Sequence, residues 1–465
     1  MPAPFYLTCA AIIAFAISFW RKRREGWGIP ACVVLITVSV WYVGDVIYND
    51  LDVYLETIGA ESLTSAWWQV LWFILVFGLL AGPVHRLINR GLSNQSSHVI
   101  AYMESDGLLQ PEVQQRISVL GGAMLAVWLV LMAIAIVMVK GDVVGLFAPY
   151  LGHKAEPWAR GQIGGGFSAL ISLAAYLQIF LTAAFGVLAA VAMNPKTRIM
   201  ALGICFLTLP YFIFDRTRNV MLATLLPGLF SFVFMRMKGG LLIKGLFLIG
   251  AFLLIVFWFT FVMANRTGST IAGAFQDGAN QEIMSTTKHE GLNMFEELAW
   301  IDSFIVTNVY VPNKGERYFA ELVNPIPRAL WKDKPMIGLD YAVARGQMAL
   351  GPEGEVTATI STGMIGQGVV NFGRFFGPAA SAFLMALWVA VLARQDLKGI
   401  NPGRLVLYAC GLILTFNMGR DITLLVVYPF IFGWVVMWSV EKKQAKTTRK
   451  MELKQELQDT GGGGR

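Results

Sequence analysis

Arginine and aspartate residues occur together in two very short polar turns between long apolar runs. One turn reads Asp-Arg-Thr-Arg at 215–218, and the other reads Gly-Arg-Asp at 419–421. A guanidinium group is a planar fork of N–H donors that suits the oxygens of a diphosphate. We therefore predict that Arg216, Arg218 and Arg420 bind such an anion. The alternative is that each arginine pairs with its neighbouring aspartate or reaches outward to phospholipid.

A third group of cations lies in a long polar segment, at residues 324–335, which read Asn-Pro-Ile-Pro-Arg-Ala-Leu-Trp-Lys-Asp-Lys-Pro. Its prolines stiffen the backbone beside Arg328 and remove N–H donors. Trp331 suits the lipid headgroup zone or stacking on a sugar. We predict that Arg328 binds the same anion, and we expect Lys332 and Lys334 to be exposed and less important.

Transfer of a group from a diphosphate also needs a base for the acceptor hydroxyl. Carboxylates and a histidine of the same polar regions are the candidates, namely Asp421, Glu353, Glu355 and His289. Orienting Arg420 is an equally good role for Asp421. Asn371, to which a glycine-rich stretch leads, is a candidate substrate contact. Arg266, directly after an apolar run, is the last candidate ligand of the anion.

The composition places these residues in a membrane protein. Of the 465 residues, 56% are hydrophobic and 14% are charged, whereas soluble domains carry roughly 25% charge. The apolar runs are long and continuous, which predicts helices and not the short alternating strands of a barrel. The net charge of +7 fits basic cytoplasmic loops better than nucleic-acid binding. The four cysteines lie in apolar runs without metal or redox spacing, so we expect no metal site and no cofactor.

We predict an all-α polytopic membrane protein with about eleven transmembrane helices. The apolar runs lie at 4–20, 28–48, 66–85, 118–139, 166–193, 199–214, 220–235, 241–263, 376–393, 405–418 and 424–440. The chain then divides into helices one to eight at 1–263, a large loop at 264–375, helices nine to eleven at 376–440, and a basic tail at 441–465.

The distribution of lysine and arginine gives the orientation. The connections rich in these residues, such as 21–24, 236–244 and the tail from Lys442, are predicted to be cytoplasmic. The N-terminus, both arginine turns and the large loop then lie on the outer side, and the C-terminus lies inside.

The large loop is expected to hold structure of its own. Residues 292–305 have the pattern of an amphipathic helix, and 338–350 is a weaker helix candidate. The glycine-rich residues 361–375 allow the chain to dip back toward the membrane. On the inner side, 97–117 predicts a short pair of interfacial helices.

These motifs together resemble the oligosaccharide repeat-unit polymerases, the O-antigen polymerase (Wzy-type) family. The resemblance rests on the two arginine turns, on Pro-Arg-x-Leu-Trp-x-x-Lys-Pro at 327–335, and on Asn-Phe-Gly at 371–373. It covers about residues 200–440. One position departs from the family pattern, because Gln367 stands where many relatives have an acidic residue.

The resemblance implies a GT-C-like fold in the bacterial inner membrane and an active site at the periplasmic face. The implied reaction moves an oligosaccharide from undecaprenyl diphosphate to a repeat unit on a second undecaprenyl diphosphate, without metal or nucleotide sugar. The product is O-antigen, capsule or exopolysaccharide. The implied partners are the lipid-linked donor and acceptor, membrane lipids and a chain-length regulator.

Three other functions stay open. An O-antigen ligase performs the same chemistry with a lipid A core acceptor, and a metal-dependent polyprenyl-phosphate-sugar transferase would use Asp50 and Asp52. A lipid-linked oligosaccharide flippase or other transporter would also need an anion site. Against transport, Asp45 and His85 are the ionisable groups nearest to span interiors, and we expect both to reach water near span ends.

Overall fold

The computed structural model describes residues 1–49, 51–92, 95–104, 110–151, 153–158, 168–213, 218–264, 293–335, 338–346, 349–350, 356–358, 361–398, 401–422 and 427–442. Within these residues, seven helices are long and apolar enough to cross a membrane. They are α1 (Ala3–Arg21), the continuous helix Gly28–Ile47, α5 (Ala60–Ile88), α7 (Pro111–Met138), α9 (Ser168–Val191), α10 (Pro195–Ile213) and α17 (Gly363–Leu397). The prediction of a helical membrane protein is confirmed.

The remaining apolar runs are helical as well, although they are not among these seven. They form α11 (Arg218–Met235), α12 (Leu241–Ala264), α18 (Pro402–Met418) and the helical residues 427–442. Each apolar run predicted from the sequence therefore coincides with helix in the described residues. Length and composition support seven membrane crossings, and the four further crossings stay predictions.

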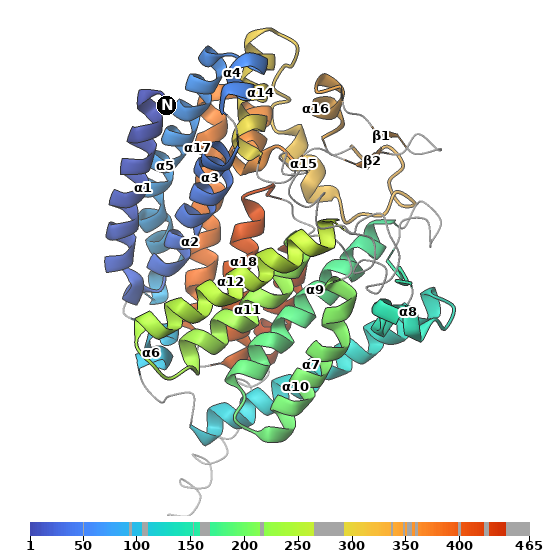
Figure 1. Cartoon of the computed structure of the whole chain (residues 1–465). Coiled ribbons are helices and arrows are strands. Elements are labelled where there is room, and N and C mark those ends of the chain that lie inside the picture. Colours follow the sequence, from blue (N-terminus) through green and yellow to red (C-terminus); the bar gives the residue numbers. More distant parts are fainter. Residues whose placement is uncertain are drawn as a thin grey trace, which may run out of the picture.

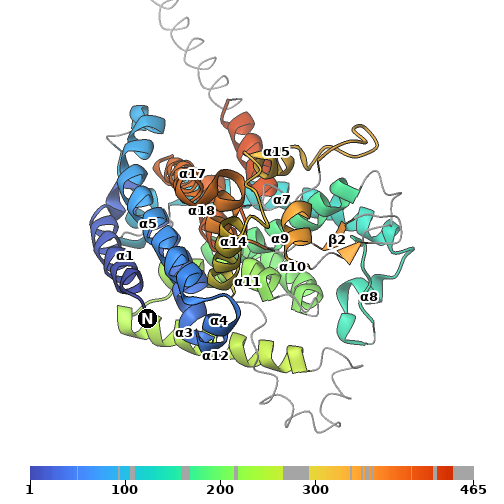
Figure 2. The ribbon, with the colours of Figure 1, turned by 90° about the horizontal axis from the view of Figure 1, so that it is seen from above.

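Two groups of helices flank a central pair. Seen from above, α17 and α18 lie in the middle, with α1 and α5 on one side and α7, α9 and α10 on the other (Figure 2). The helix Gly28–Ile47 consists of α2 (Gly28–Val38), the π-helical turn Ser39–Val43 and most of α3 (Gly44–Tyr48). Helix α5 packs along α17, and α11 contacts both α9 and α18.

Short helices lie at the two ends of the bundle. They are α4 (Leu51–Thr57), α6 (His98–Glu104) and α8 (Val143–Phe147). The predicted helix pair at 97–117 is only partly correct. Its first member is α6, whereas Pro111 begins the long helix α7, because proline is well accommodated in a first helical turn.

Short helices and a small ribbon form a cap at the end of the bundle where the chain begins (Figure 1). The cap consists of α14 (Met294–Val306), α15 (Glu316–Val323), α16 (Leu339–Ala344) and the antiparallel strands β1 (Ala349–Leu350) and β2 (Val356–Ala358). The amphipathic helix predicted at 292–305 is confirmed as α14. The helix predicted at 338–350 is right only for α16, because 349–350 pair as a strand.

Helix α17 reverses direction at Gly373, whose backbone angles (φ 79°, ψ −179°) only glycine adopts readily. The residues before it fold back along those after it. Ser381 Oγ donates to the Met364 carbonyl oxygen at 2.7 Å. Gly368 and Gly377 lie so close that a Cβ on either would overlap the backbone of the other. The glycine-rich segment is thus the first arm of a helical hairpin.

Asp45 and His85 are buried, with 0% and 5% exposure, so the expectation that they reach water is wrong. Asp45 Oδ2 accepts the backbone N–H groups of Phe295 at 2.8 Å and Glu296 at 3.1 Å. The carboxylate of α3 therefore caps the first turn of α14 and ties the cap to the bundle. His85 stacks on Trp27.

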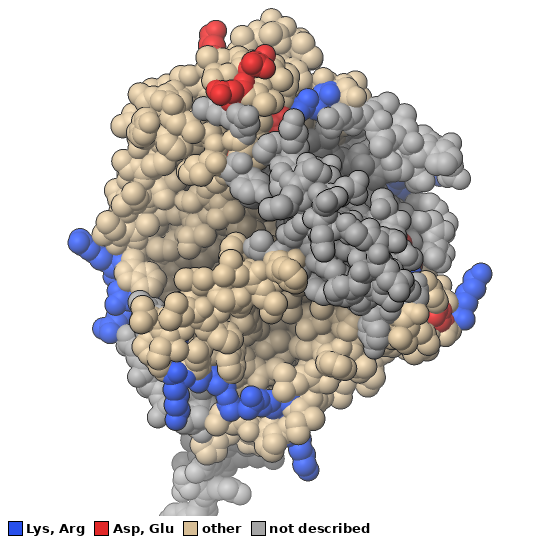
Figure 3. Space-filling view, viewed as in Figure 1, with Lys and Arg blue, Asp and Glu red and all other residues tan. Residues whose placement is uncertain are grey.

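The two ends of the molecule differ in charge. Lysine and arginine side chains gather mostly toward the end away from the cap, while carboxylates gather at the cap end (Figure 3). Exposed Asp52 and Glu56 belong to α4, which lies beside the cap, whereas exposed Arg21 ends α1 at its far end and exposed Lys22 follows it. The predicted orientation rests on this asymmetry.

Candidate functional site

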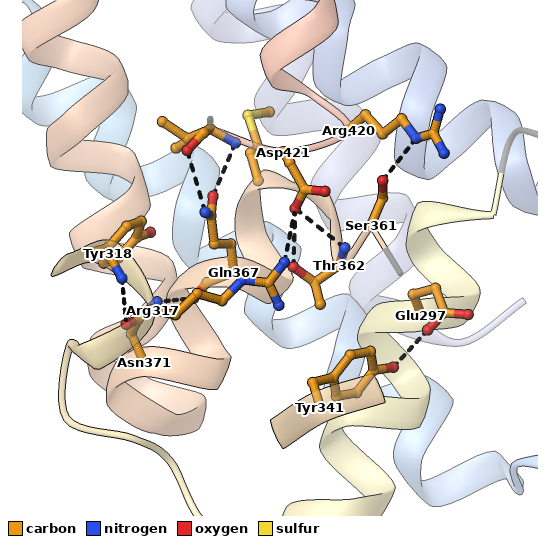
Figure 4. A network of polar contacts seen from close by, with 12 residues as sticks. Glu297, Arg317, Tyr318, Tyr341, Ser361, Thr362, Gln367, Asn371, Arg420 and Asp421 are labelled. Atoms are coloured by element: carbon orange, nitrogen blue, oxygen red, sulfur yellow. Dashed lines mark hydrogen bonds and ion pairs between the residues drawn. The ribbon is translucent and has the colours of Figure 1, made fainter. Parts of the chain in front are cut away.

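The turn after α18 and the segment before α17 bring charged groups together beneath the cap (Figure 4). Asp421 Oδ1 accepts the backbone N–H of Thr362 at 3.3 Å and its hydroxyl at 3.1 Å. The same oxygen lies 3.6 Å from Nη2 of Arg317, on α15. Arg420 Nε donates to Ser361 Oγ at 2.8 Å. We call these five residues the cap-junction cluster.

Backbone contacts with the α17 hairpin hold the turn after α18 in place. The Met364 N–H donates to the Gly419 carbonyl oxygen at 3.1 Å. The buried Gln367 amide pairs with both backbone groups of Ile422, accepting at 2.9 Å and donating at 3.2 Å. A carboxylate at this position would lose the donated bond. The amide of Gln367, with one donor group and one acceptor, therefore suits this position.

Arg420 and Asp421 do not pair with each other. Figure 4 shows the Arg420 side chain directed toward Ser361, away from Arg317, while Asp421 points into the cluster. The interpretation that Arg420 pairs with its neighbouring aspartate is therefore wrong. The Arg420 side chain is exposed and its guanidinium is accessible to a ligand. Ser361 contacts both side chains, so a role of Asp421 in orienting Arg420 through Ser361 stays a prediction.

Arg317 is the cluster residue that the sequence analysis missed. It is 3% exposed, and among the described residues its Nε and Nη1 have no hydrogen-bond partner. These two nitrogens carry three of the five guanidinium N–H donors. Its Cζ also lies against Gly338, where an added Cβ would come within 3.4 Å. Unpaired donors in a buried cation are costly, so the site is electrostatically incomplete as it stands.

The environment of Asp421 favours its neutral form more than water does. Burial raises the pKa of Asp421 above its usual range, while the Arg317 guanidinium and the donors of Ser361 and Thr362 oppose this rise. A carboxyl group of this kind holds a proton more readily than an exposed aspartate. It is therefore better matched to general-base work near neutral pH.

Asn371 fastens α15 to the hairpin. Its side chain is 0% exposed. Its Oδ1 accepts the Tyr318 N–H at 3.2 Å, and its Nδ2 donates to the Gln367 carbonyl at 2.7 Å. Because Tyr318 follows Arg317, this contact positions the buried guanidinium. The role of Asn371 as a direct substrate contact stays a prediction.

The proline-stiffened segment folds on itself beside α15. Arg328 Nη1 donates to the Lys332 carbonyl at 3.1 Å, and the Trp331 ring meets the Phe319 ring edge-on at 6.4 Å. Lys334 is 7% exposed and donates to two backbone carbonyls of its own segment, both at 2.8 Å. The expectation that Lys334 is exposed is wrong. Burial, with help from Arg328, lowers the pKa of Lys334.

The other predicted site residues fall outside what the structure describes. Arg216, Arg266, His289, Glu353 and Glu355 lie outside the described residues. Arg218 begins α11, but its side chain is also outside them. Helix α11 packs against α18, whose end carries Arg420. The described residues thus bring together two predicted residues, Arg420 and Asp421, with one unforeseen arginine.

Two further ion pairs, each with a buried carboxylate on α14, hold this helix in place. Asp302 is 1% exposed and contacts Arg374 Nε at 2.6 Å. Its Oδ1 also accepts from Ser65 Oγ at 2.8 Å, and Gln69 donates to the same oxygen. These contacts join α14 to α5 and to the turn of the α17 hairpin. Burial raises the pKa of Asp302, against the attraction of Arg374.

The second pair joins α14 to α16. Glu297 accepts from the Tyr341 hydroxyl at 2.5 Å and lies 3.4 Å from Arg345 Nη2. The Arg345 guanidinium stacks over Trp300 at 4.5 Å. Burial raises the pKa of Glu297, which Tyr341 and Arg345 oppose. The buried Glu297 carboxylate has hydrogen-bonding and charged partners, whereas Arg317 has donors without partners among the described residues. The contacts of Glu297 therefore stabilise the cap.

The cap-junction cluster combines an enclosed cation with spare donors, an accessible cation and a carboxylate between them. Such a set suits an anionic group with several oxygens next to a proton-transfer step. Among the described residues, no group of three or more His, Cys, Asp or Glu side chains lies together as a metal site would need. No family model matches the chain, and no curated protein or solved structure matches it.

Proposed function

We propose that this protein is a glycosyltransferase that polymerises undecaprenyl-diphosphate-linked oligosaccharide repeat units into a surface polysaccharide. The observation that carries the proposal is the placement of Arg317 and Arg420 on either side of the Asp421 carboxylate, beside the ends of apolar helices. A lipid-linked diphosphate sits at the membrane boundary, and the ends of apolar helices such as α18 are expected to reach that boundary beside this cluster.

The arginines and the aspartate have different roles in the proposed reaction. The acceptor hydroxyl attacks the anomeric carbon of the donor, and undecaprenyl diphosphate leaves with the bonding electrons. Arg317 and Arg420 stabilise the negative charge that grows on the bridging oxygen, which lowers the barrier more than it strengthens ground-state binding. Asp421 takes the proton of the acceptor hydroxyl.

The charge asymmetry supports a periplasmic site. The end with Arg21 and Lys22 is rich in basic residues, as expected of a cytoplasmic face. The cap and the cap-junction cluster lie at the opposite end, with the N-terminus of α1. This topology, with eleven spans in a GT-C-like arrangement, is part of the proposal.

An O-antigen ligase is the second candidate. Its leaving group is the same, so the cap-junction cluster suits it equally, and only the Pro-Arg-x-Leu-Trp motif at 327–335 favours the polymerase. Within the described part of the chain, Trp331 packs against Phe319 of α15, and Arg328 donates to the Lys332 carbonyl of its own segment. In this proposal, these residues contribute to the surface of the cap beside α15, where an acceptor glycan would bind.

A reconstituted assay separates the candidates. The purified protein in liposomes receives donor repeat unit on undecaprenyl diphosphate, in the presence of EDTA and without lipid A. A polymerase lengthens the glycan on undecaprenyl diphosphate. A ligase forms product only when lipid A core is added, and a flippase moves the lipid across the bilayer without forming a glycosidic bond.

A further inference from the structure

We propose that the Asp421 carboxylate competes with the donor diphosphate for the Arg317 guanidinium. Binding of the donor then frees this carboxylate to act as the base. The inference rests on the proposed function, and it specifies the order in which the site is used. The donor enters first and takes the guanidinium, and the acceptor hydroxyl can be deprotonated only afterwards.

The contacts of the two partners are unequal. Asp421 keeps two hydrogen bonds from Thr362, at 3.3 and 3.1 Å, without any help from Arg317. The Arg317 contact at 3.6 Å is longer than an N–H···O hydrogen bond, so it is a charge contact only. Asp421 therefore loses little local bonding when Arg317 turns to another anion.

Arg317 has the opposite need. Its Nε and Nη1 are buried and without partners among the described residues, so Asp421 leaves most of its donor capacity unused. A diphosphate brings several charged oxygens, whereas the carboxylate offers Arg317 a single oxygen. The planar fork of arginine binds such oxygens in pairs, with charge-assisted hydrogen bonds. The diphosphate is therefore the better ligand and displaces the contact to Asp421.

The displacement changes the strength of the base. The charged or titratable groups facing Asp421 are Arg317 and Tyr318 on α15, Tyr42 on the helix Gly28–Ile47, and Arg420 in its own turn. Both tyrosines are neutral at physiological pH, and Arg420 is directed toward Ser361. Arg317 is thus the cation whose charge opposes the rise in the pKa of Asp421. Engaging it with a diphosphate raises the proton affinity of the carboxylate.

The resulting step is balanced. As the acceptor oxygen bonds to the anomeric carbon, its proton passes to Asp421, and the bond from that carbon to the diphosphate oxygen breaks. The diphosphate leaves with the electron pair and stays on Arg317. Its departure returns the guanidinium to Asp421, which lowers the proton affinity of the carboxylate and releases the proton to water. The contact between Arg317 and Asp421 therefore also returns the carboxylate to its deprotonated form after each transfer.

Binding of inorganic pyrophosphate to the full-length protein in nanodiscs, measured by calorimetry, tests the competition without any glycan. Asp421→Asn removes the competing charge and should tighten pyrophosphate binding by at least about tenfold, since close charge pairs couple by that much or more. Arg317→Gln should abolish the binding. The matched controls are Asp340→Asn, whose carboxylate accepts from Tyr310 and Asn313, and Lys314→Gln, which removes an exposed cation three residues before Arg317. Both controls should bind as the wild type does.

Equal or weaker binding by Asp421→Asn would overturn the competition, and so would wild-type affinity in Arg317→Gln. The second result would mean that ordered water completes Arg317 and that the anion binds elsewhere. Should the asparagine variant fail to fold, Asp421→Ser removes the charge with a smaller side chain and carries the same expectation. Chain growth is scored separately. A polymerising wild type with no competition at Arg317 refutes only the ordering, whereas confirmed competition without chain growth refutes the proposed function.

Discussion

The carboxylate of Asp421 faces Arg317 across 3.6 Å, although Arg420 is its neighbour in the chain. The two partners come from α15 in the cap and from the turn after α18, about a hundred residues apart. Contact between them therefore requires that the cap is docked on the bundle. Asp45, which caps α14, and Asn371, which holds Tyr318, maintain that docking.

The first prediction concerns the buried guanidinium. Arg317→Gln should reduce chain growth by about 10² to 10³, the usual effect of removing one preorganised donor to a developing anion. Arg317→Lys should restore little, because an ammonium group lacks the planar fork. Polymer length and rate are measured in liposomes. Lys314→Gln, which removes an exposed cation three residues earlier, is the matched control and should retain activity. Full-length polymer from Arg317→Gln would contradict the assignment.

The second prediction concerns pH. A general base works only when ionised, so the rate should rise with pH through the pKa of Asp421. Because burial raises that pKa, the rise should be centred above the ordinary aspartate value of about 3.9. Asp421→Asn should lose most activity and flatten this limb of the profile. The measurement is a pH–rate profile with saturating donor. An unchanged inflection in the asparagine variant would assign the base elsewhere.

The third prediction concerns the α17 hairpin. Gly368→Ala places a methyl group against the Gly377 backbone, which cannot yield. Such overpacking typically costs about 1–3 kcal/mol and occasionally more. Gly366→Ala is the matched control, because the nearest atom to its new Cβ would be the flexible tip of Ile301 at 2.8 Å, with other atoms at ordinary contact distance. Thermal unfolding in detergent should show a clear loss for the first variant and a smaller one for the second. Equal melting temperatures would argue against the observed close approach.

The fourth prediction concerns Asp302 and Arg374. Burial holds the folded pKa of Asp302 above its unfolded value, so the folded state binds the proton more tightly. The contribution of this group to stability therefore falls as pH rises from about 3.9 through the folded pKa. Arg374→Ala raises that pKa further and should steepen the decline. The loss should stay below the about 3–5 kcal/mol of a fully buried pair, because Arg374 is 43% exposed.

Melting temperatures at a series of pH values test this. The double variant Asp302→Asn with Arg374→Ala removes the buried charge together with its partner, so its profile should be flatter than that of Arg374→Ala. Parallel profiles for the wild type, the single variant and the double variant would show that Asp302 does not titrate in this range.

The helices were predictable because a run of about 20 apolar residues suffices to specify a membrane-spanning helix. The amphipathic pattern of α14 was equally local. The reversal at Gly373 was visible only as a glycine-rich stretch, because its meaning lies in the contact between Gly368 and Gly377. The burial of Asp45 depends on the arrival of α14 from a distant part of the chain.

The candidate site was predictable only in part. Short turns between apolar runs drew attention to Arg420 and Asp421, which do lie together at the cap. Arg317 sits between Glu316 and Tyr318 on a short cap helix, where a charged residue is usually solvated. Nothing in its neighbours indicates burial, because the partner that encloses it follows about a hundred residues later. The sequence contained one indication of a role for Arg317. It is a further cation in the predicted outer loop that also contains the proline-stiffened residues 324–335.

Reconstituted chain growth is the most direct test of the central claim. Wild-type protein in liposomes, given only repeat unit on undecaprenyl diphosphate and EDTA, should build a ladder of longer glycans on that lipid, and Arg317→Gln and Arg420→Gln should each build almost none. A wild type that forms no glycosidic bond under these conditions, or arginine variants that build the same ladder, would contradict the account.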